Sequence, residues 1–387
     1  MRRAPVLLAA GLLLAGCATT SLAPVTGAGV AFEADEQRLW RRSEEEQRTL
    51  DRSGLLYVEP EFDVYLNQVA RRLQPPGIYR SIPFRIRVIS NPRLNAFAFP
   101  NGVIYLHTGL LARLDNEAQL AMVLAHEMTH ATHRHAVKDS RDTKNKTAWL
   151  AGVQTALGGL PGVGGLVGVL GEIGTAAAVA GHSRDLEREA DSEGLRLLVR
   201  AGYDPRETAK LFQALQREAE REKMEVSLFY ASHPRLEERR ETVEELLRTA
   251  YRDRRGGATN AGVYLAKTSR VVLENARMDL KAGRFEAARQ GAEKYFTLRP
   301  NDARGHYLLG EVLRQQGGDG VAEEAMARYR RAIALDRSYP DPHKGLGLVH
   351  FQRGEKPQCR ASLEAYVSLS PQAADRAYIE EYIRQCK

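Results

Sequence analysis

Apolar positions along the first part of the chain follow two spacings, and each spacing predicts a different kind of element. Residues 33–52 and 61–73 repeat apolar side chains every three or four positions, which predicts two amphipathic helices. Residues 83–90 alternate apolar and basic side chains, as a half-buried strand does. Residues 95–111 predict two further strands around a Pro-Asn-Gly turn, followed by a helix that Asp115 can cap. This order predicts a domain of helices around a small sheet.

The middle of the chain contains a long uncharged stretch with two interpretations. Residues 147–171 hold no Asp, Glu, Lys or Arg and are long enough to cross a membrane. Glycine pairs and Pro161 divide the stretch, which favours two short helices with a Gly/Pro loop packed on a soluble core. A segment that dips into a membrane is the alternative. Charged amphipathic helices are expected from Ser183 to about Tyr251.

A second domain is predicted after a polar, glycine-rich linker at residues 252–266. Residues 267–387 hold similar units of about 34 residues. The units begin near Ser269, Ala303 and Pro340. One glycine marks the turn within each unit: Gly283, Gly317 and Gly354. The pattern resembles the tetratricopeptide repeat, in which stacked helical hairpins bury apolar faces that a single hairpin leaves exposed. A helical bundle without repeats is the alternative.

The N-terminus has the pattern of a secretion signal. In residues 1–17 two arginines precede a short apolar run that ends in Leu-Ala-Gly-Cys. This ending resembles a bacterial lipobox, which implies that Cys17 is lipidated and that residues 18–32 tether the protein to the periplasmic side of the outer membrane, in its inner leaflet. Cleavage of an ordinary signal nearby, with Cys17 as an incidental thiol, is the alternative.

Composition places the chain among globular proteins and argues against one class of partner. Hydrophobic residues make up 43% and charged residues 27% of the chain. The net charge of +7 falls to +5 without Arg2 and Arg3, because 54 basic residues then face 49 acidic ones. These charges are interleaved, so we expect no nucleic-acid binding. Besides Cys17, the chain holds Cys359 and Cys386, which can pair in an oxidising periplasm or remain reduced.

The sequence His-Glu-Met-Thr-His at residues 126–130 carries the clearest chemical signal. Positions four apart on a helix project from one face, so His126 and His130 can direct two imidazole nitrogens at one zinc ion. Glu127 then lies close to a zinc-bound water and can take its proton as the water attacks a peptide carbonyl. Because the surrounding helix is apolar, a metal site explains this motif better than an exposed charged cluster does.

Further histidines and a downstream acidic pair add candidates. His133 lies too far along the helix axis to share the ion, and His135 should point to the opposite side as a packed or capping residue. Glu187 and Asp191 are four apart on another predicted helix. Glu187 can be a third ligand, and Asp191 can accept a hydrogen bond from a ligand histidine. From these acidic residues alone, a solvated helix face is the favoured interpretation.

Three motifs together resemble the HtpX/BepA-like gluzincin metallopeptidases: HEMTH, the preceding NAFAFPNG and the later EREAD. The resemblance covers residues 33–251. It implies three ligands for Zn²⁺, namely His126, His130 and Glu187. It also implies that Glu127 is catalytic and that Asp191 supports a ligand histidine. A peptide substrate would add to an edge strand, which the resemblance places at Asn95, Ala96, Phe97, Ala98 and Phe99.

Residues 232–240 resemble the HPxxxxR segment of the same family. By this match, His233 can occupy the fourth position on the zinc and displace the water, which would make it a self-inhibiting latch. Arg239 can steady the oxyanion of the transition state. The alternative is that His233 caps a helix begun by Pro234, with Arg239 on the surface.

The expected fold is therefore mainly α, with an α+β gluzincin-like metallopeptidase domain followed by a tetratricopeptide-repeat solenoid. The expected function is a zinc-dependent endopeptidase, anchored at the outer membrane in the bacterial periplasm, that degrades misfolded or stalled envelope proteins. Its repeats are expected to bind these clients or the outer-membrane assembly machinery. The alternative function is a repeat-based assembly chaperone or scaffold for outer-membrane proteins, with a latched or structural zinc site.

Overall fold

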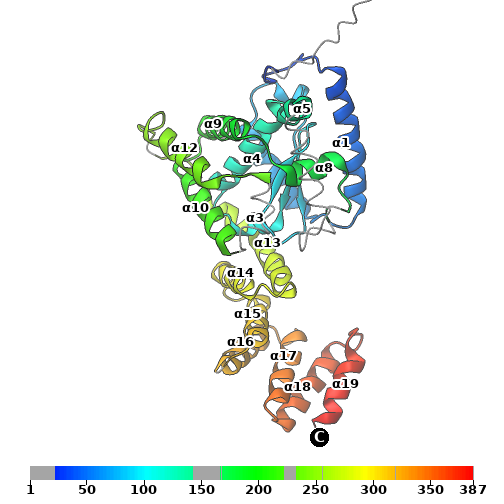
Figure 1. Ribbon diagram of the computed structural model, residues 1–387. Helices are drawn as coiled ribbons and strands as arrows, with labels where there is room; N and C mark the ends of the chain where they lie inside the picture. Colours follow the sequence, from blue (N-terminus) through cyan, green and yellow to red (C-terminus); the bar gives the residue numbers. More distant parts are fainter. Residues whose placement is uncertain are drawn as a thin grey trace, which may run out of the picture.

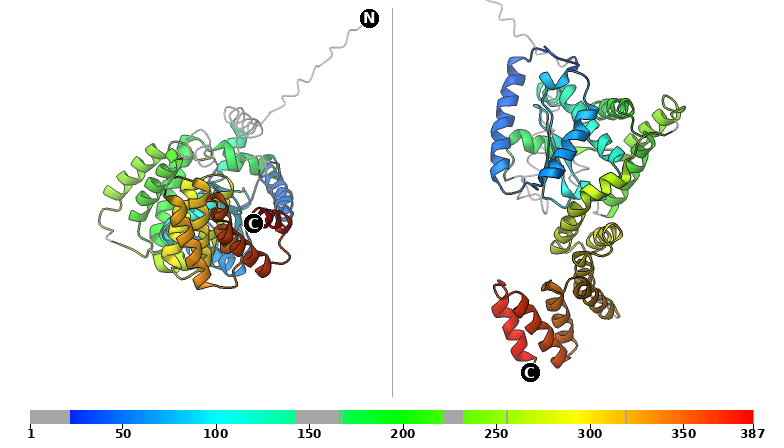
Figure 2. Two further views of the ribbon diagram at one scale, coloured as in Figure 1. Left: turned by 90° about the horizontal axis from the view of Figure 1, so that it is seen from below. Right: turned by 180° about the vertical axis from the view of Figure 1, so that it is seen from behind.

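The computed structural model describes residues 22–142, 166, 168–221, 232–254, 256–318 and 320–386. An α+β domain is followed by an elongated tail of helices, and the C-terminus lies at the far end of this tail (Figures 1 and 2). The predicted signal, Cys17 and most of the uncharged stretch lie outside the described residues. Within the described part of the chain, no helix is both long and apolar enough to cross a membrane.

The α+β domain contains short and long helices around one small sheet. In chain order its elements are α1 (Ala34–Arg52), α2 (Pro60–Leu73), the 3-10 helix η1 (Ile78–Arg80), β1 (Arg85–Ile89), β2 (Ala96–Ala98), β3 (Val103–His107), α3 (Thr108–Arg113), α4 (Glu117–Thr132), α5 (His135–Arg141), α8 (Glu172–Thr175), the π-helix η2 (Ala176–Ala180), α9 (Arg184–Arg200), α10 (Arg206–Arg221) and α12 (Leu236–Arg248). The predicted fold class, mainly α with a small sheet, is confirmed.

The sheet has the strand order β1-β3-β2. β1 runs parallel to β3, and β2 pairs antiparallel with β3, so that β2 forms an edge. The predicted Pro-Asn-Gly turn joins β2 to β3. Gly102 has φ +85° there, and an added Cβ would lie 2.4 Å from a methyl group of Ile82, so this turn requires glycine. The turn places the edge strand beside α4, which carries the histidine motif.

Helix α4 is buried along its whole length, because α2 and the sheet pack on it from one side and α9 and α10 from the other. Its N-cap is Asn116, whose side chain accepts the Gln119 N–H at 3.0 Å. The prediction that Asp115 caps this helix is wrong by one position. The backbone N–H of Asp115 instead donates to the Gln119 side chain. Such complete burial suits a helix that must present polar ligands at a fixed position.

The tail consists of helical hairpins that stack in sequence. Its helices are α13 (Ala261–Lys281), α14 (Phe285–Leu298), α15 (Ala303–Gln316), α16 (Val321–Leu335), α17 (Asp341–Gln352), α18 (Lys356–Leu369) and α19 (Arg376–Gln385). The three predicted turn glycines all have φ +71° and lie between the helices of a pair. Neighbouring hairpins meet where a buried tyrosine faces a glycine: Tyr295 faces Gly305, and Tyr329 faces Gly345. A Cβ at either glycine would overlap the ring, so these positions fix the spacing of the hairpins.

The segment predicted as a linker, residues 252–266, is partly helical and bonded to the α+β domain. Helix α13 already begins at Ala261, within residues 252–266. Just before it, Ala258 pairs with Tyr203 as a β-bridge, and Thr259 accepts the N–H of Glu117 at 3.0 Å. The Tyr264 hydroxyl then donates to the Leu111 carbonyl at 2.6 Å. These backbone bonds hold the first hairpin of the tail against the α+β domain.

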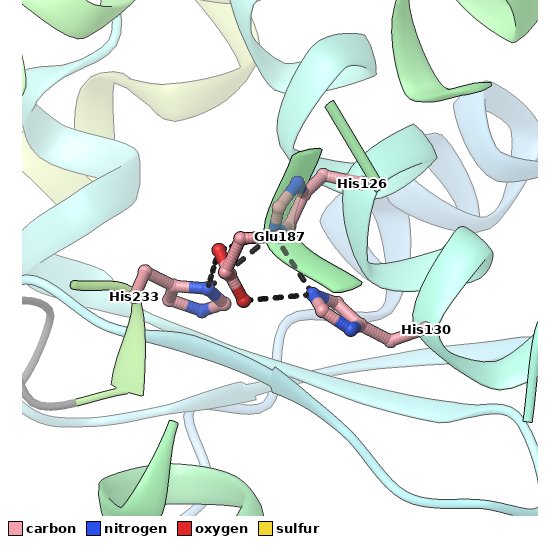
Figure 3. A group of neighbouring side chains, drawn as sticks. All are labelled: His126, His130, Glu187 and His233. Atoms are coloured by element: carbon pink, nitrogen blue, oxygen red, sulfur yellow. Dashed lines mark hydrogen bonds and ion pairs between the residues drawn. The ribbon is translucent and has the colours of Figure 1, made fainter. Parts of the chain in front are cut away.

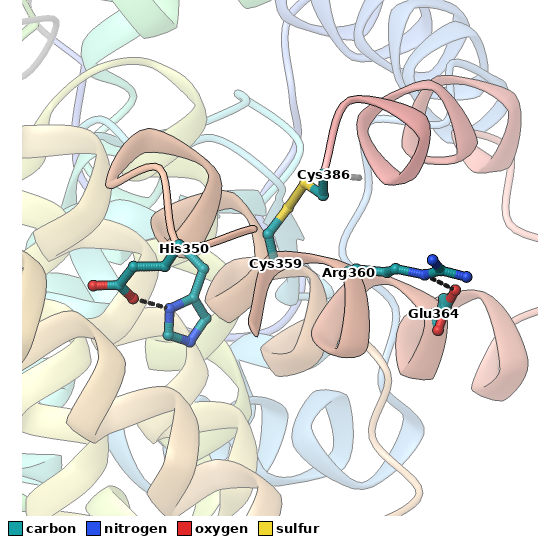
Figure 4. The surroundings of a disulfide bond; sticks show 6 residues. His350, Cys359, Arg360, Glu364 and Cys386 are labelled. Carbon is teal, nitrogen blue, oxygen red and sulfur yellow. Dashed lines mark hydrogen bonds and ion pairs between the residues drawn. A yellow bond between two sulfur atoms is a disulfide. The ribbon is translucent and has the colours of Figure 1, made fainter. Parts of the chain in front are cut away.

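A disulfide closes the far end of the tail. Cys359 on α18 pairs with Cys386, directly after α19 (Figure 4). Of the two states left open by the sequence, the structure therefore has the paired one. Both cysteines are buried in a small apolar cluster with Leu363 and Ile379. The bond holds α19 on the preceding hairpin, where α19 covers an apolar face of α17 and α18.

Candidate metal centre

Four side chains from separate parts of the α+β domain converge on one point (Figure 3). His126 and His130 come from α4, Glu187 from the first turn of α9, and His233 from the segment before α12. Each is at most 5% exposed. Helix α9 can approach α4 closely because it carries Gly194, where a Cβ would lie 3.2 Å from the His126 backbone nitrogen. The structure thus brings together the residues that the sequence proposed as ligands.

The ligand atoms of the four residues all lie within 4.8 Å of one another. His126 Nε2 lies 2.9 Å from His130 Nε2, 3.3 Å from His233 Nδ1 and 3.5 Å from a Glu187 carboxylate oxygen. The other Glu187 oxygen lies 3.4 Å from His130 Nε2, and His233 Nδ1 lies 3.3 Å from Glu187. Tetrahedral zinc with bonds of about 2.0–2.1 Å needs ligand atoms about 3.3 Å apart. These five spacings are close to the value that one small four-coordinate ion requires.

The chemistry of the four groups also fits a metal. Two imidazole Nε2 atoms that face each other at 2.9 Å need either a proton or a metal ion between them. Glu187 Oε1 is buried and accepts no hydrogen bond from the described residues. A cation between these groups satisfies all of them at once. Imidazole nitrogens with a carboxylate oxygen are a ligand set that suits zinc.

Asp191 and Arg239 support the ligands from behind. Asp191 Oδ1 lies 3.0 Å from His126 Nδ1, as predicted for the outer partner of a ligand histidine. Arg239 bonds Asp191 through Nε at 2.8 Å and Nη2 at 2.7 Å, and its Nη1 lies 2.9 Å from Glu187. Burial alone would raise the pKa of Glu187, but Arg239 and the surrounding imidazoles hold this pKa well below its usual range. Glu187 is therefore ionised and ready to bind a cation.

The pKa of His126 links metal binding to pH. Burial and the nearby Arg239 oppose protonation, yet hydrogen bonds to Asp191 and Glu187 raise the pKa of His126 to about 9. In the metal-free protein at neutral pH this imidazole therefore carries a proton, which a metal must displace from Nε2. Lower pH accordingly weakens metal binding.

His135 was predicted to point away from the motif, and this prediction is wrong. The helix ends at Thr132, because Arg134 adopts φ +57° and reverses the chain. His135 turns back, so that its Nδ1 lies 2.8 Å from Nδ1 of His130, while its Nε2 lies 3.2 Å from Glu189. The contacts from Glu189 through His135 to His130 fix the tautomer of His130 and leave its Nε2 free for a metal. No glycine marks the reversal at Arg134, so residue types alone do not predict it.

His182 is a second histidine whose place beside the metal centre the sequence did not predict. Its ring stacks on that of His130, with centroids 4.0 Å apart and planes at 18°, and its Nδ1 lies 2.6 Å from Asp139. The one available signal was its position directly before Ser183, where a helix was expected to begin. His133 lies beside Glu189 at 3.8 Å and outside the ligand set, as predicted.

Comparison with known proteins assigns this domain. Residues 61–247 match the family model described as Peptidase family M48. The chain contains a peptidase family M48 domain. Residues 320–354, within the predicted repeat region, match a model described as TPR repeat. The metal centre thus lies in the domain of a metallopeptidase family, and the predicted family and repeats are confirmed.

Curated relatives match part of the chain. The beta-barrel assembly-enhancing protease of Yersinia pestis is 30% identical over 229 residues, which is 54% of this chain and 45% of that protein. Its counterpart in Escherichia coli (strain K12) is 32% identical over 162 residues, or 41% and 33%. The mitochondrial metalloendopeptidase OMA1 of Arabidopsis thaliana is 35% identical over 137 residues, or 35% and 26%. The chain spans less than half the length of each of these relatives.

In the peptidase domain, Glu127 and the edge strand lie beside the four ligands. Glu127 is 2% exposed, and its Oε1 lies 3.3 Å from His233 Nε2. The same His233 nitrogen lies 3.2 Å from the carbonyl oxygen of Ala96 in β2. Arg239 is buried, which rules out the surface position considered as its alternative. Because its guanidinium nitrogens face Asp191 and Glu187, the predicted contact with a substrate oxyanion stays a prediction.

Proposed function

We propose that this chain is a zinc-dependent endopeptidase. The convergence of His126, His130 and Glu187 on one point, with Glu127 beside them, carries the proposal. Zinc held by these three side chains supplies a Lewis acid that polarises a peptide carbonyl and makes bound water acidic. Zinc is the choice because imidazoles and one carboxylate at tetrahedral spacing suit it better than they suit magnesium or calcium.

The residues of the chain have distinct tasks in this mechanism. Glu127 takes the proton of the attacking water and returns it to the leaving nitrogen. The edge strand β2 aligns an extended peptide through its backbone groups, which requires a substrate segment without secondary structure. Asp191 and Arg239 act through the ligands by holding His126 and Glu187 in place.

His233 gives the resting site a latch in this proposal. Its Nδ1 completes the tetrahedral set, so that no corner remains for water, while its Nε2 lies against Glu127 and Ala96. One side chain thus covers the fourth ligand position, the base and a backbone group of the edge strand. Hydrolysis requires His233 to leave.

The proposed setting is the periplasmic side of the bacterial outer membrane. The resemblance of the N-terminus to a lipobox supports an anchor at Cys17, and the disulfide between Cys359 and Cys386 suits an oxidising compartment. Relatives named beta-barrel assembly-enhancing proteases support misfolded or stalled envelope proteins as substrates. The helical repeats would hold these clients or the machinery that assembles them.

Replacing the latch tests this function. In the full-length chain loaded with zinc, His233→Ala should raise the rate of casein hydrolysis by about tenfold or more, because it opens the fourth ligand position to water. A chelator should abolish the activity of wild type and variant, and added zinc should restore it. His343→Ala, in the repeat domain, is the matched control and should leave the rate at the wild-type value.

The second candidate function is a scaffold with a latched or structural zinc site. The closed position of His233 favours this function. The same experiment distinguishes it from the peptidase. If His233→Ala binds one zinc per chain and hydrolyses nothing, the peptidase proposal is wrong and the scaffold is favoured. If wild type and His233→Ala are equally active, the peptidase stands and the latch is wrong.

A further inference from the structure

We propose that a cavity beside His130 selects the substrate, and that it accepts a bulky apolar side chain next to the scissile bond. This inference rests on the proposed peptidase function and adds the substrate class. The cavity has a volume of about 400 Å³, within the range of roughly 300–1,000 Å³ that is usual for ligand pockets. His130 is the one metal ligand among the residues that line the cavity, and His126, Glu187 and His233 are not part of the lining.

The cavity lies where it can receive the side chain of the substrate residue next to the cleaved bond. One side is formed by Ala98 and Phe99, at the end of the edge strand, and another by the metal ligand His130. A peptide that adds to β2 places its reactive carbonyl near the ligands, and its neighbouring side chains follow at the strand spacing of about 3.3 Å per residue. A side chain adjacent to the reacting carbonyl can therefore enter the cavity.

The walls of the cavity favour an apolar side chain. Leu39, Phe99, Ile173 and several alanines line it: Ala131, Ala136, Ala176 and Ala177. These small side chains leave the space that a bulky substrate group can fill, and filling an apolar pocket is favourable in proportion to the surface buried.

The charged residues of the lining form pairs with each other. Arg42 lies 3.0 Å from Glu172, and His182 lies 2.6 Å from Asp139. A charged substrate side chain would lose its hydration in the cavity without a dedicated partner, which is costly. The described lining thus disfavours Asp, Glu, Lys and Arg in the substrate.

Helix α1 builds the outer wall, although it precedes the region matched to the peptidase family. The Glu46 carboxylate accepts the N–H groups of Ile173 at 3.0 Å and Gly174 at 2.7 Å, which holds α8 against α1. Gly174 packs so closely on Phe99 that an added Cβ would lie 2.9 Å from its ring. The wall is therefore preformed.

Peptides that differ at one position test the pocket. Full-length His233→Ala, loaded with zinc, is given two series of quenched fluorescent peptides with Phe, Leu, Ala, Asp or Lys on either side of the scissile bond. In one series, kcat/KM for Phe and Leu should exceed that for Ala by about tenfold or more, because buried methylene groups discriminate on that scale. Asp and Lys should be cleaved most slowly.

A filled pocket provides the decisive comparison. Adding Ala136→Phe should lower kcat/KM for Phe and Leu by about tenfold or more and leave that for Ala nearly unchanged, since Ala136 lines the cavity. His343→Ala, in the repeat domain and outside the cavity, is the control and should keep the original order. Zinc content and the unfolding temperature of each variant show that the site and the fold are intact. Equal rates for all five residues, or a loss that is the same for every peptide, would overturn the pocket.

Failure of the peptidase proposal gives a different result. If zinc-loaded His233→Ala cleaves no peptide, the proposed function is wrong. Peptide binding to zinc-loaded Glu127→Gln/His233→Ala, followed by fluorescence anisotropy, then measures the cavity without hydrolysis. Tighter binding of Phe than of Ala, reversed by Ala136→Phe, supports the pocket, and equal binding of both peptides refutes it.

Discussion

Glu127→Gln should keep the metal and lose peptide hydrolysis by a factor of about 10²–10⁴. The amide has nearly the shape of the carboxylate, and Glu127 lies outside the set of four ligands, so metal content should stay at the wild-type value. An amide cannot take a proton from water, however, which removes general base catalysis. Zinc content by mass spectrometry and casein hydrolysis, both in a His233→Ala background, measure the two effects separately.

Glu193→Gln on the outer side of α9 is the control for this exchange and should change neither property. Loss of metal in Glu127→Gln would show that Glu127 holds the ion, and full activity would show that another group is the base. In cells, a Glu127→Gln chain that maintains envelope integrity as well as wild type would favour the scaffold over the peptidase.

Arg239→Ala should destabilise the metal-free protein by about 3–5 kcal/mol, because it leaves two buried carboxylates without their counter-charge. Arg239 is 5% exposed and bonds Asp191 while lying 2.9 Å from Glu187. In the zinc-loaded protein the loss should be smaller, since the ion itself compensates Glu187. Urea unfolding of both forms, followed by circular dichroism, gives the two free energies of unfolding.

Arg240→Ala is a close control for the preceding change. Arg240 is the next residue on α12 and lies 3.8 Å from Glu244 in a partly exposed pair outside the metal centre, so its removal should cost no more than about 0.5 kcal/mol. A loss below about 1 kcal/mol for Arg239→Ala, with or without zinc, would contradict the supporting role of this guanidinium.

Local patterns in the sequence predicted much of the fold and the ligand set. The strands follow from alternation and a glycine turn, and the paired imidazoles follow from helical spacing, because both signals lie within a few residues. Glu187 was harder to identify. Its acidic neighbours favoured a solvated face, and only the resemblance to a family pointed to the buried position that the structure has.

Other features depend on contacts between distant segments, which residue spacing does not encode. The turn at Arg134 needs no glycine, so the return of His135 to His130 was missed. The glycines before α13 predicted a linker, yet the backbone at Ala258 pairs with Tyr203. The cavity beside His130 needs α1, far from the motif in the sequence, to form one wall.

The central claim is that His126, His130, Glu187 and His233 hold one zinc ion. X-ray absorption at the zinc edge, on protein of measured metal content, tests it most directly. We expect one zinc per chain with about four nitrogen or oxygen ligands near 2.0 Å, most of them imidazole, and one imidazole fewer in His233→Ala. Substoichiometric zinc, or an imidazole count unchanged by His233→Ala and by His130→Ala, would contradict it.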